Sequence, residues 1–122
     1  MTDTHIQTGK IGESEGVAYL KQLGYRILEE NYRTPFGEID AIAKESGAIV
    51  FVEIKTRRGT GYGFPEEAVH ERKQRKLVQS AQCYLKRVRK LSAPSRFDVL
   101  SISIRSDGGF EFNLIRNAFE VP

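Results

Sequence analysis

Residues 37–55, GEIDAIAKESGAIVFVEIK, decide the fold of this chain. β-Branched and aromatic residues flank a central Ser-Gly pair, a pattern that predicts two antiparallel strands joined by a tight turn. With the Ser-Gly pair in the turn, Asp40 faces Glu53 across the hairpin, and Glu38 faces Lys55. The hairpin is therefore expected to bring acidic side chains and a lysine together at its open end.

The two sides of this hairpin differ in polarity, because side chains alternate along a strand. One side is wholly apolar and consists of Ile39, Ala41, Ala43, Val50, Val52 and Ile54. The other side begins with Ile42 against Phe51 and becomes charged toward the open end. A strand pair that is apolar on both sides is expected to be covered on both, which puts Asp40 and Glu53 at the rim of a buried layer. Since opposed carboxylates repel each other, the pattern predicts a cation between them.

Composition sets the broad class of the protein. The 122 residues, 39% hydrophobic and 29% charged, predict a single domain over residues 1–122. One cysteine, Cys83, excludes an internal disulfide, and with only two histidines it argues against a zinc site. The chain has neither an apolar run of membrane-spanning length nor the pattern of a secretory signal, so we expect a cytoplasmic protein with no membrane partner.

A first helix is predicted from about Ile6 to Leu23, with Gly24 as its stop. Three glycines weaken it, so we expect its first turns to be irregular. Glu13 shares one helix face with Val17 and Leu20, which makes it an acid on the inward side. Helix geometry alone favours a capping or ion-pairing role for Glu13 at a fraying first turn.

A second helix is predicted from Glu66 to about Leu91. Its apolar stripe is Leu77, Ala81, Tyr84, Val88 and Leu91. No acid occurs between Arg72 and Lys90, where the eight basic residues are Arg72, Lys73, Arg75, Lys76, Lys86, Arg87, Arg89 and Lys90. A charged outer face is usually only solvated, but such faces normally mix signs, so this one slightly favours nucleic-acid contact.

The remaining segments complete an alternating pattern of strands and turns. Strands are predicted over 25–32, 96–104 and 110–115, and a glycine-rich loop over 56–65. This loop is either a flexible connection or, with Arg57, Arg58, Tyr62 and Phe64, a segment that touches a phosphate backbone and stacks on a base. Asp98 is either a fourth acid near the site or a partner for Arg96.

The acids and the lysine of the hairpin suit phosphodiester hydrolysis. Asp40 and Glu53 supply hard oxygen ligands of the kind that Mg²⁺ or Mn²⁺ takes. Lys55 lies two residues beyond Glu53 and projects to the same side, where its ammonium can orient a water or stabilise charge on an attacked phosphate.

The segments Gly37-Glu38-Ile39-Asp40 and Phe51-Val52-Glu53-Ile54-Lys55-Thr56-Arg57 resemble the Asp…Glu-x-Lys core of the PD-(D/E)xK nuclease superfamily. Where the superfamily motif has Pro-Asp, this chain has Ile39-Asp40, a substitution the superfamily tolerates. More closely, the chain resembles the YraN-like family of predicted endonucleases, which is distantly related to Holliday-junction resolvases. Further matching positions are Gly12-Glu13 with Ala18, Gly24-Tyr25, Asn31, Gly63 with Pro65, Lys73, Ala81 and Arg96-Phe97-Asp98-Val99.

This resemblance implies a set of roles for individual residues. Asp40 and Glu53 would ligate the metal, together with the backbone carbonyl of Ile54, and Lys55 would be the catalytic lysine. Glu13 would match the acid that related nucleases contribute from their first helix, which reverses the preference for a capping role. The implied fold is α/β (α+β), a central mixed β-sheet flanked by α-helices with a restriction-endonuclease-like core. Related resolvases are dimers, so a homodimer is expected by analogy alone.

The leading expectation is therefore a Mg²⁺- or Mn²⁺-dependent endonuclease that acts on DNA, including branched or distorted DNA. A nucleic-acid-binding module with little or no catalysis on the same scaffold is the alternative. In a third interpretation, the acids and the lysine only satisfy one another as a buried ionic cluster of an interaction protein. The expected nucleic-acid contacts are Arg57, Arg58, Arg72, Lys73 and Lys76.

Overall fold

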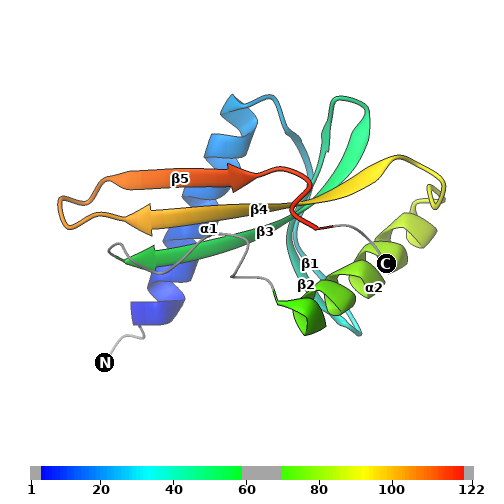
Figure 1. Cartoon of the computed structure of the whole chain (residues 1–122), viewed down its shortest axis with the longest axis horizontal. Helices are drawn as coiled ribbons and strands as arrows, with labels where there is room; N and C mark the ends of the chain where they lie inside the picture. Colours follow the sequence, from blue (N-terminus) through cyan, green and yellow to red (C-terminus); the bar gives the residue numbers. More distant parts are fainter. Residues whose placement is uncertain (1–3, 59–69, 120–122) are drawn as a thin grey trace.

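The structure, a computed structural model, describes residues 4–58 and 70–119 (Figure 1). Its elements are α1 (Thr4–Gln22), β1 (Arg26–Thr34), β2 (Gly37–Glu45), β3 (Ala48–Arg58), α2 (Glu71–Arg87), β4 (Ser95–Ile104) and β5 (Phe110–Ile115). Within these residues, no helix is both long and apolar enough to span a membrane.

The five strands form one sheet in the order β1-β2-β3-β4-β5. β3 and β4 are parallel and are connected through α2, whereas all other neighbours are antiparallel. In Figure 1, α1 crosses behind the long strands and α2 lies in front, beside β1 and β2. The expected central mixed sheet flanked by helices, of class α/β (α+β), is confirmed, and it is consistent with a nuclease-like core.

Each helix covers its own hydrophobic core. On the α1 side, Leu20 packs among residues of β2, β3 and β4 such as Val52 and Leu100. On the α2 side, Leu77 and Tyr84 pack among the other alternating set, which includes Phe51. β3 is buried on both faces from Ile49 to Ile54; within this stretch the charged Glu53 is buried, whereas Lys55, Arg57 and Arg58 follow toward its end.

Two glycines of α1 hold this helix close to the sheet. A methyl group added at Gly12 would collide with the side chain of Thr56, and one added at Gly16 would lie 3.1–3.3 Å from three aliphatic side chains of β3 and β4. The irregular first turns that we expected are absent from the described helix, which is continuous from Thr4. The glycines lower the intrinsic helix propensity, but they allow a close approach that buries the inward face.

Helix α2 is shorter than predicted. It begins at Glu71, because His70 has an extended backbone (φ −76°, ψ 170°) and caps the helix by accepting a hydrogen bond from the Lys73 amide at its Nδ1 (3.4 Å). Residues 66–69 of the predicted helix lie outside the described residues. At the other end, Arg89 has a positive φ of 58°, so the helix ends at Arg87 and leaves Leu91 exposed. The predicted apolar stripe is therefore wrong at its last member.

Strand β3 is longer than predicted. It continues to Arg58, because every residue from Ile49 to Arg58 has a partner on the parallel strand β4. Arg57 and Arg58 therefore lie on a strand and not in the expected loop, and the rest of that loop, with Tyr62 and Phe64, lies outside the described residues.

Candidate active site

The hairpin pairs as predicted, but only as far as Ala41. Pairing of β2 with β3 runs from Glu45–Ala48 to Ala41–Val52 in the predicted register and stops there. Beyond this point, Asp40 Oδ2 accepts a hydrogen bond from the backbone N–H of Ile54 (2.7 Å), the kind of bond that a strand carbonyl would otherwise accept. The expected facing pairs, Asp40 with Glu53 and Glu38 with Lys55, are thus not ladder partners in the described strands.

Strand β2 also departs from regular alternation at this position. Ile39 packs in the α2-side core with Ile42, whereas alternation predicted it beside Ala41 in the α1-side core. The change accompanies the end of the β2–β3 ladder and the side-chain hydrogen bond of Asp40. The irregularity turns acidic side chains of β2 toward the end of the sheet, where they meet α1.

Three carboxylates from two elements converge there. Glu13 of α1 and Glu38 and Asp40 of β2 each have an oxygen within 4.8 Å of the others. The Asn31 amide, oriented with its nitrogen toward the acids, donates to Glu13 Oε2 (3.2 Å) and to Glu38 Oε1 (2.8 Å). The sequence placed Glu38 at the charged end of the hairpin and Asn31 among the positions of the resemblance, but it assigned neither of them a metal-binding or a catalytic role. Two features of the sequence could have indicated these residues. Glu38 lies two residues before Asp40 and thus on the same side of a regular strand, and Asn31 is an asparagine within a run of strand-forming residues.

The position of Glu13 excludes the capping role that helix geometry alone favoured. Because α1 begins at Thr4, Glu13 lies in the interior of the helix, where no amide needs a cap. Burial raises the pKa of Glu13, and the negative charge of Glu38 raises it further. Glu13 is therefore an inward acid that belongs to the group around Asp40.

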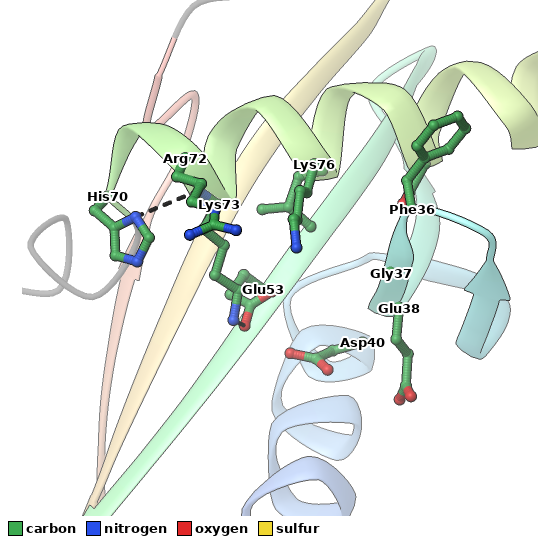
Figure 2. A pocket seen from close by; sticks show the side chains of 11 residues that line it. Phe36, Gly37, Glu38, Asp40, Glu53, His70, Arg72, Lys73 and Lys76 are labelled. Carbon is green, nitrogen blue, oxygen red and sulfur yellow. Dashed lines mark hydrogen bonds and ion pairs between the residues drawn. The ribbon is translucent and has the colours of Figure 1, made fainter.

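Glu53 is buried and ion-paired with two lysines. Its Oε1 lies 2.7 Å from Lys73 Nζ and 3.9 Å from Lys55 Nζ, and its side chain is only 6% exposed. In Figure 2 the Lys73 side chain extends from α2 down to Glu53. Lys73 was expected to contact nucleic acid, but the structure places its ammonium on the acid at the centre of the site.

The charges at this site shift one another's pKa. Burial and then the negative charge of Glu53 raise the pKa of Asp40 to about 7. Burial and the adjacent Lys73 ammonium lower the pKa of Lys55. Burial is the largest single effect on Lys73 and works against its charged form, but the hydrogen bond and the charge attraction with Glu53, together with the nearby Lys55 and Asp40, raise its pKa overall. Such mutual shifts are typical of functional sites.

A cleft of ≈ 580 Å³ opens between α2 and the ends of β2 and β3 (Figure 2). The sheet side of its lining is acidic, with Glu38, Asp40 and Glu53, and the helix side is basic, with Arg72 and Lys76 in addition to Lys73. Of the expected nucleic-acid contacts, Arg72 and Lys76 thus lie at the cleft, together with Lys73. Arg57 and Arg58 are not among the described residues that line it. The full lining is Phe36, Gly37, Glu38, Asp40, Glu53, His70, Arg72, Lys73, Lys76, Leu77 and Ser80.

Asp98 is a partner for Arg96 and not a fourth acid of the site. Its carboxylate accepts hydrogen bonds from Tyr25 Oη (2.7 Å), Arg96 Nε (3.1 Å) and the backbone N–H of Asn117 (2.9 Å). Arg96 is also bonded to Glu45, next to the β2–β3 turn. Burial, with the Asp98 carboxylate, raises the pKa of Tyr25 to about 12. This polar cluster therefore fastens β4 to the turn end of the hairpin.

The donor set fits a hard divalent cation. Carboxylate oxygens of Glu13, Glu38 and Asp40 face one another, and mutual repulsion in a partly buried place favours a bound cation. Glu53 belongs to the same electrostatic group, because its charge acts on Asp40. The Ile54 amide is part of this arrangement through Asp40, whereas the role of the Ile54 carbonyl stays a prediction.

Comparison with known proteins identifies a family whose members align with the part of the chain that forms this site. The model of the uncharacterised protein family UPF0102 matches residues 12–102, which include all the acids and lysines described above. A UPF0102 protein of Syntrophus aciditrophicus is 46% identical over 117 residues, 96% of this chain and 91% of the relative. Others are from Persephonella marina, 46% identical over 93% of each chain, and Geobacter sulfurreducens, 43% identical over 93% of this chain and 88% of the relative.

Proposed function

Because this chain belongs to the uncharacterised protein family UPF0102, whose description names no activity, we propose its function from the candidate site. We propose that it hydrolyses phosphodiester bonds in nucleic acid, DNA in the first place, with Mg²⁺ or Mn²⁺. The observation that carries this proposal is the convergence of Glu13, Glu38 and Asp40 within 4.8 Å, at a cleft whose opposite wall is basic.

The likeness of the hairpin to the PD-(D/E)xK core supports the same activity. The closer likeness to the YraN-like family of predicted endonucleases adds branched or distorted DNA as a substrate class, because Holliday-junction resolvases are distant relatives of that family. Both likenesses include Asp40, Glu53 and Lys55, which lie at or beside the cleft.

In this proposal Asp40, Glu53 and Glu13, with the backbone carbonyl of Ile54, would hold the cation. When bound, a divalent cation supplies Lewis acidity, which polarises a phosphoryl oxygen and activates a water. Glu38 adds a further carboxylate to the group and is held toward Glu13 by Asn31. Asp40 is itself fixed by the Ile54 amide, so the acids are positioned before any ligand arrives.

The cationic side chains act on the substrate. The Lys55 ammonium lies beside Glu53, where it can stabilise negative charge that develops on the attacked phosphate. Arg72 and Lys76, on the other wall of the cleft, bind the flanking phosphates of the strand. Lys73 is ion-paired with the Glu53 carboxylate, and a cation on Glu53 would compete with this ion pair.

A second candidate function follows from that ion pair. Glu53 already has two ammonium partners, so its charge is compensated without a metal ion. A nucleic-acid-binding module that uses the basic wall of the cleft, with little or no catalysis, agrees with this observation. Calorimetric titration with Mn²⁺ separates the two functions, since the binding module predicts no uptake that depends on Asp40.

Cleavage of labelled linear, single-stranded, flap and four-way-junction DNA, with Mg²⁺, Mn²⁺ or EDTA, tests the nuclease directly. We expect cutting that requires the cation and that falls by at least about a hundredfold in Asp40→Asn and Lys55→Met, as for the loss of one electrostatic group at an active site. The matched controls are Asp107→Asn and Lys44→Met, which alter an exposed acid and an exposed lysine away from the cleft.

The enzymatic proposal would be contradicted if all of these DNA substrates stayed intact at every cation concentration. Cutting that survives unchanged in both site variants would contradict it equally, because the activity would then come from elsewhere. Salt-dependent DNA binding without cutting would leave the second candidate in place.

A further inference from the structure

An aromatic side chain stands exposed at the rim of the cleft. Phe36 lies in the turn between β1 and β2, is 42% exposed, and lines the cleft with residues of α2. In Figure 2, Phe36 and His70 lie at opposite ends of the drawn group, with Lys76 between them. Nothing in the catalytic proposal above uses Phe36.

The turn that carries Phe36 is fastened to α2. The Thr34 hydroxyl accepts a hydrogen bond from the Phe36 amide (3.1 Å) and donates one to the Gly37 carbonyl (3.0 Å). The same hydroxyl lies 2.8 Å from that of Ser80, which is buried on α2. The backbone beneath Phe36 is therefore held in place, and the ring is presented to solvent by a fixed support, which lowers the entropic cost of stacking against it.

The charges around Phe36 set the direction in which a nucleotide can lie. Phosphates are repelled by Glu38 and Asp40 on the sheet wall and attracted by Arg72 and Lys76 on the helix wall. A base that belongs to those phosphates then faces the β1–β2 turn. An exposed aromatic face beside a basic track is the arrangement with which proteins bind unpaired nucleotides.

We propose that the cleft binds an unpaired nucleotide segment, with one base stacked on Phe36 and the adjoining phosphates on Arg72 and Lys76. The volume of ≈ 580 Å³ suits this ligand, since it lies within the range of roughly 300–1,000 Å³ typical of sites that enclose small molecules. A base inside a duplex has both faces covered by its neighbours, so the stacked position requires a single strand, a flap or an unpaired junction. This inference rests on the proposed function in one respect, that the nucleic acid binds in this cleft. It does not require that the protein cleaves the nucleic acid.

Binding in EDTA tests the inference without any cleavage. The chain has no tryptophan, so Phe36→Trp introduces a single fluorophore at the proposed stacking position. We expect an oligothymidylate to quench this fluorescence, and a blunt-ended duplex without a loop, at equal nucleotide concentration, to leave it unchanged. Absence of quenching at saturating oligothymidylate would overturn the inference.

Affinity measurements on a second variant provide an independent readout. Phe36→Ala is expected to weaken oligothymidylate binding about tenfold, as for the loss of one stacked base, and to leave duplex binding unchanged. Phe36→Tyr should restore the affinity, and Leu23→Ala is the control, because Leu23 is an exposed apolar residue of similar exposure (40%) away from the cleft. Equal losses for single strand and duplex, or no loss for either, would contradict the stacking role.

The two proposals fail in different experiments. Loss of Phe36 stacking leaves the test of metal-dependent cutting with Asp40→Asn untouched. Conversely, an inactive protein can still bind an unpaired nucleotide through Phe36 in EDTA.

Discussion

Asp40 joins the structural and the chemical parts of the site in one side chain. Its carboxylate accepts the Ile54 N–H where the β2–β3 ladder ends, and it faces Glu13 and Glu38. The pKa of Asp40 is raised from 3.8 to about 7, first by burial and then by Glu53. The folded protein therefore keeps a proton on Asp40 between about pH 4 and 7, where the unfolded chain has released it.

A pH-dependent stability follows from this shift. The wild-type protein loses stability as the pH rises from about 4 to 7, because the unfolded chain releases this proton at a lower pH than the folded protein does. Asn carries no such charge and still offers an oxygen to the Ile54 amide. We expect Asp40→Asn to be more stable than wild type at pH 8 by on the order of 2 kcal/mol, and equally stable near pH 4. Urea unfolding at both pH values measures the difference.

Asp107→Asn is the control for this measurement. Asp107 is exposed, and the hydrogen bond from the Gly109 amide lowers its pKa. The negative charge of Asp107 is therefore favourable in the folded state, and Asp107→Asn is expected to bring no gain in stability at pH 8. A loss of stability in Asp40→Asn at pH 8 would show that the negative charge of Asp40 is not a cost in the folded state.

At the scale of elements, the position of α1 depends on its glycines. Gly12→Ala would push the helix away from Thr56 on β3, and we expect a loss of about 1–3 kcal/mol, as for over-packing of a tight interface. Gly9→Ala lies in the same helix with open space around it, so we expect a gain of about 0.5–1 kcal/mol from helix propensity alone. Thermal unfolding of both variants checks the contrast, which disappears if the two alanines act alike.

Local sequence determined the strands better than the helix ends. The Ser-Gly turn set the β2–β3 register, because the alternation on each side left no second choice. The ends of α2 had no such marker: the residue with left-handed backbone at its C-terminus is Arg89 and not glycine, and the N-cap is His70 and not Ser, Thr, Asp or Asn. The start of the helix was therefore predicted directly after Pro65, because proline is common at the first position of a helix.

Part of the site was predictable from the sequence: Glu13 through the family resemblance, Arg72 and Lys76 from the basic helix, and the hairpin residues from their own pattern. Asp40, Glu53 and Lys55 follow from strand alternation and the resemblance of the motif. The contributions of Asn31 and Lys73 could not be predicted, because they depend on how β1 pairs with β2 and how α2 lies across the sheet. The role of Asp98 could not be decided from the sequence, because its hydrogen-bond partners Tyr25 and Asn117 are far from it along the chain.

At the scale of the whole molecule, a net charge of only +3 conceals a separation of charge. Acids gather at one end of the sheet, whereas α2 exposes basic residues at and beyond the cleft. Binding of DNA to this surface would release counterions, so affinity should fall steeply with salt.

Neutralising two cations of the cleft should flatten that dependence. We expect Arg72→Gln with Lys76→Gln to reduce the slope of log affinity against log salt concentration by roughly two, one for each phosphate contact. The control removes the same charge elsewhere, with Arg26→Gln and Lys44→Gln, which are exposed and face each other across β1 and β2. Fluorescence anisotropy at several salt concentrations gives both slopes, and equal slopes would place the DNA outside the cleft.

The strand order also determines when the charges of the site meet during folding. β1, β2 and β3 are joined by two short turns and pair through contacts close in sequence, which form early, whereas β4 can join only after the crossover through α2. The acids of β2 and β3 are thus brought together by the first half of the chain, before Lys73 can reach Glu53. A nascent chain must crowd these negative charges with Lys55 but without the closer Lys73 ammonium, so we expect the earliest steps of folding to depend on protons and dissolved cations more than the finished protein does.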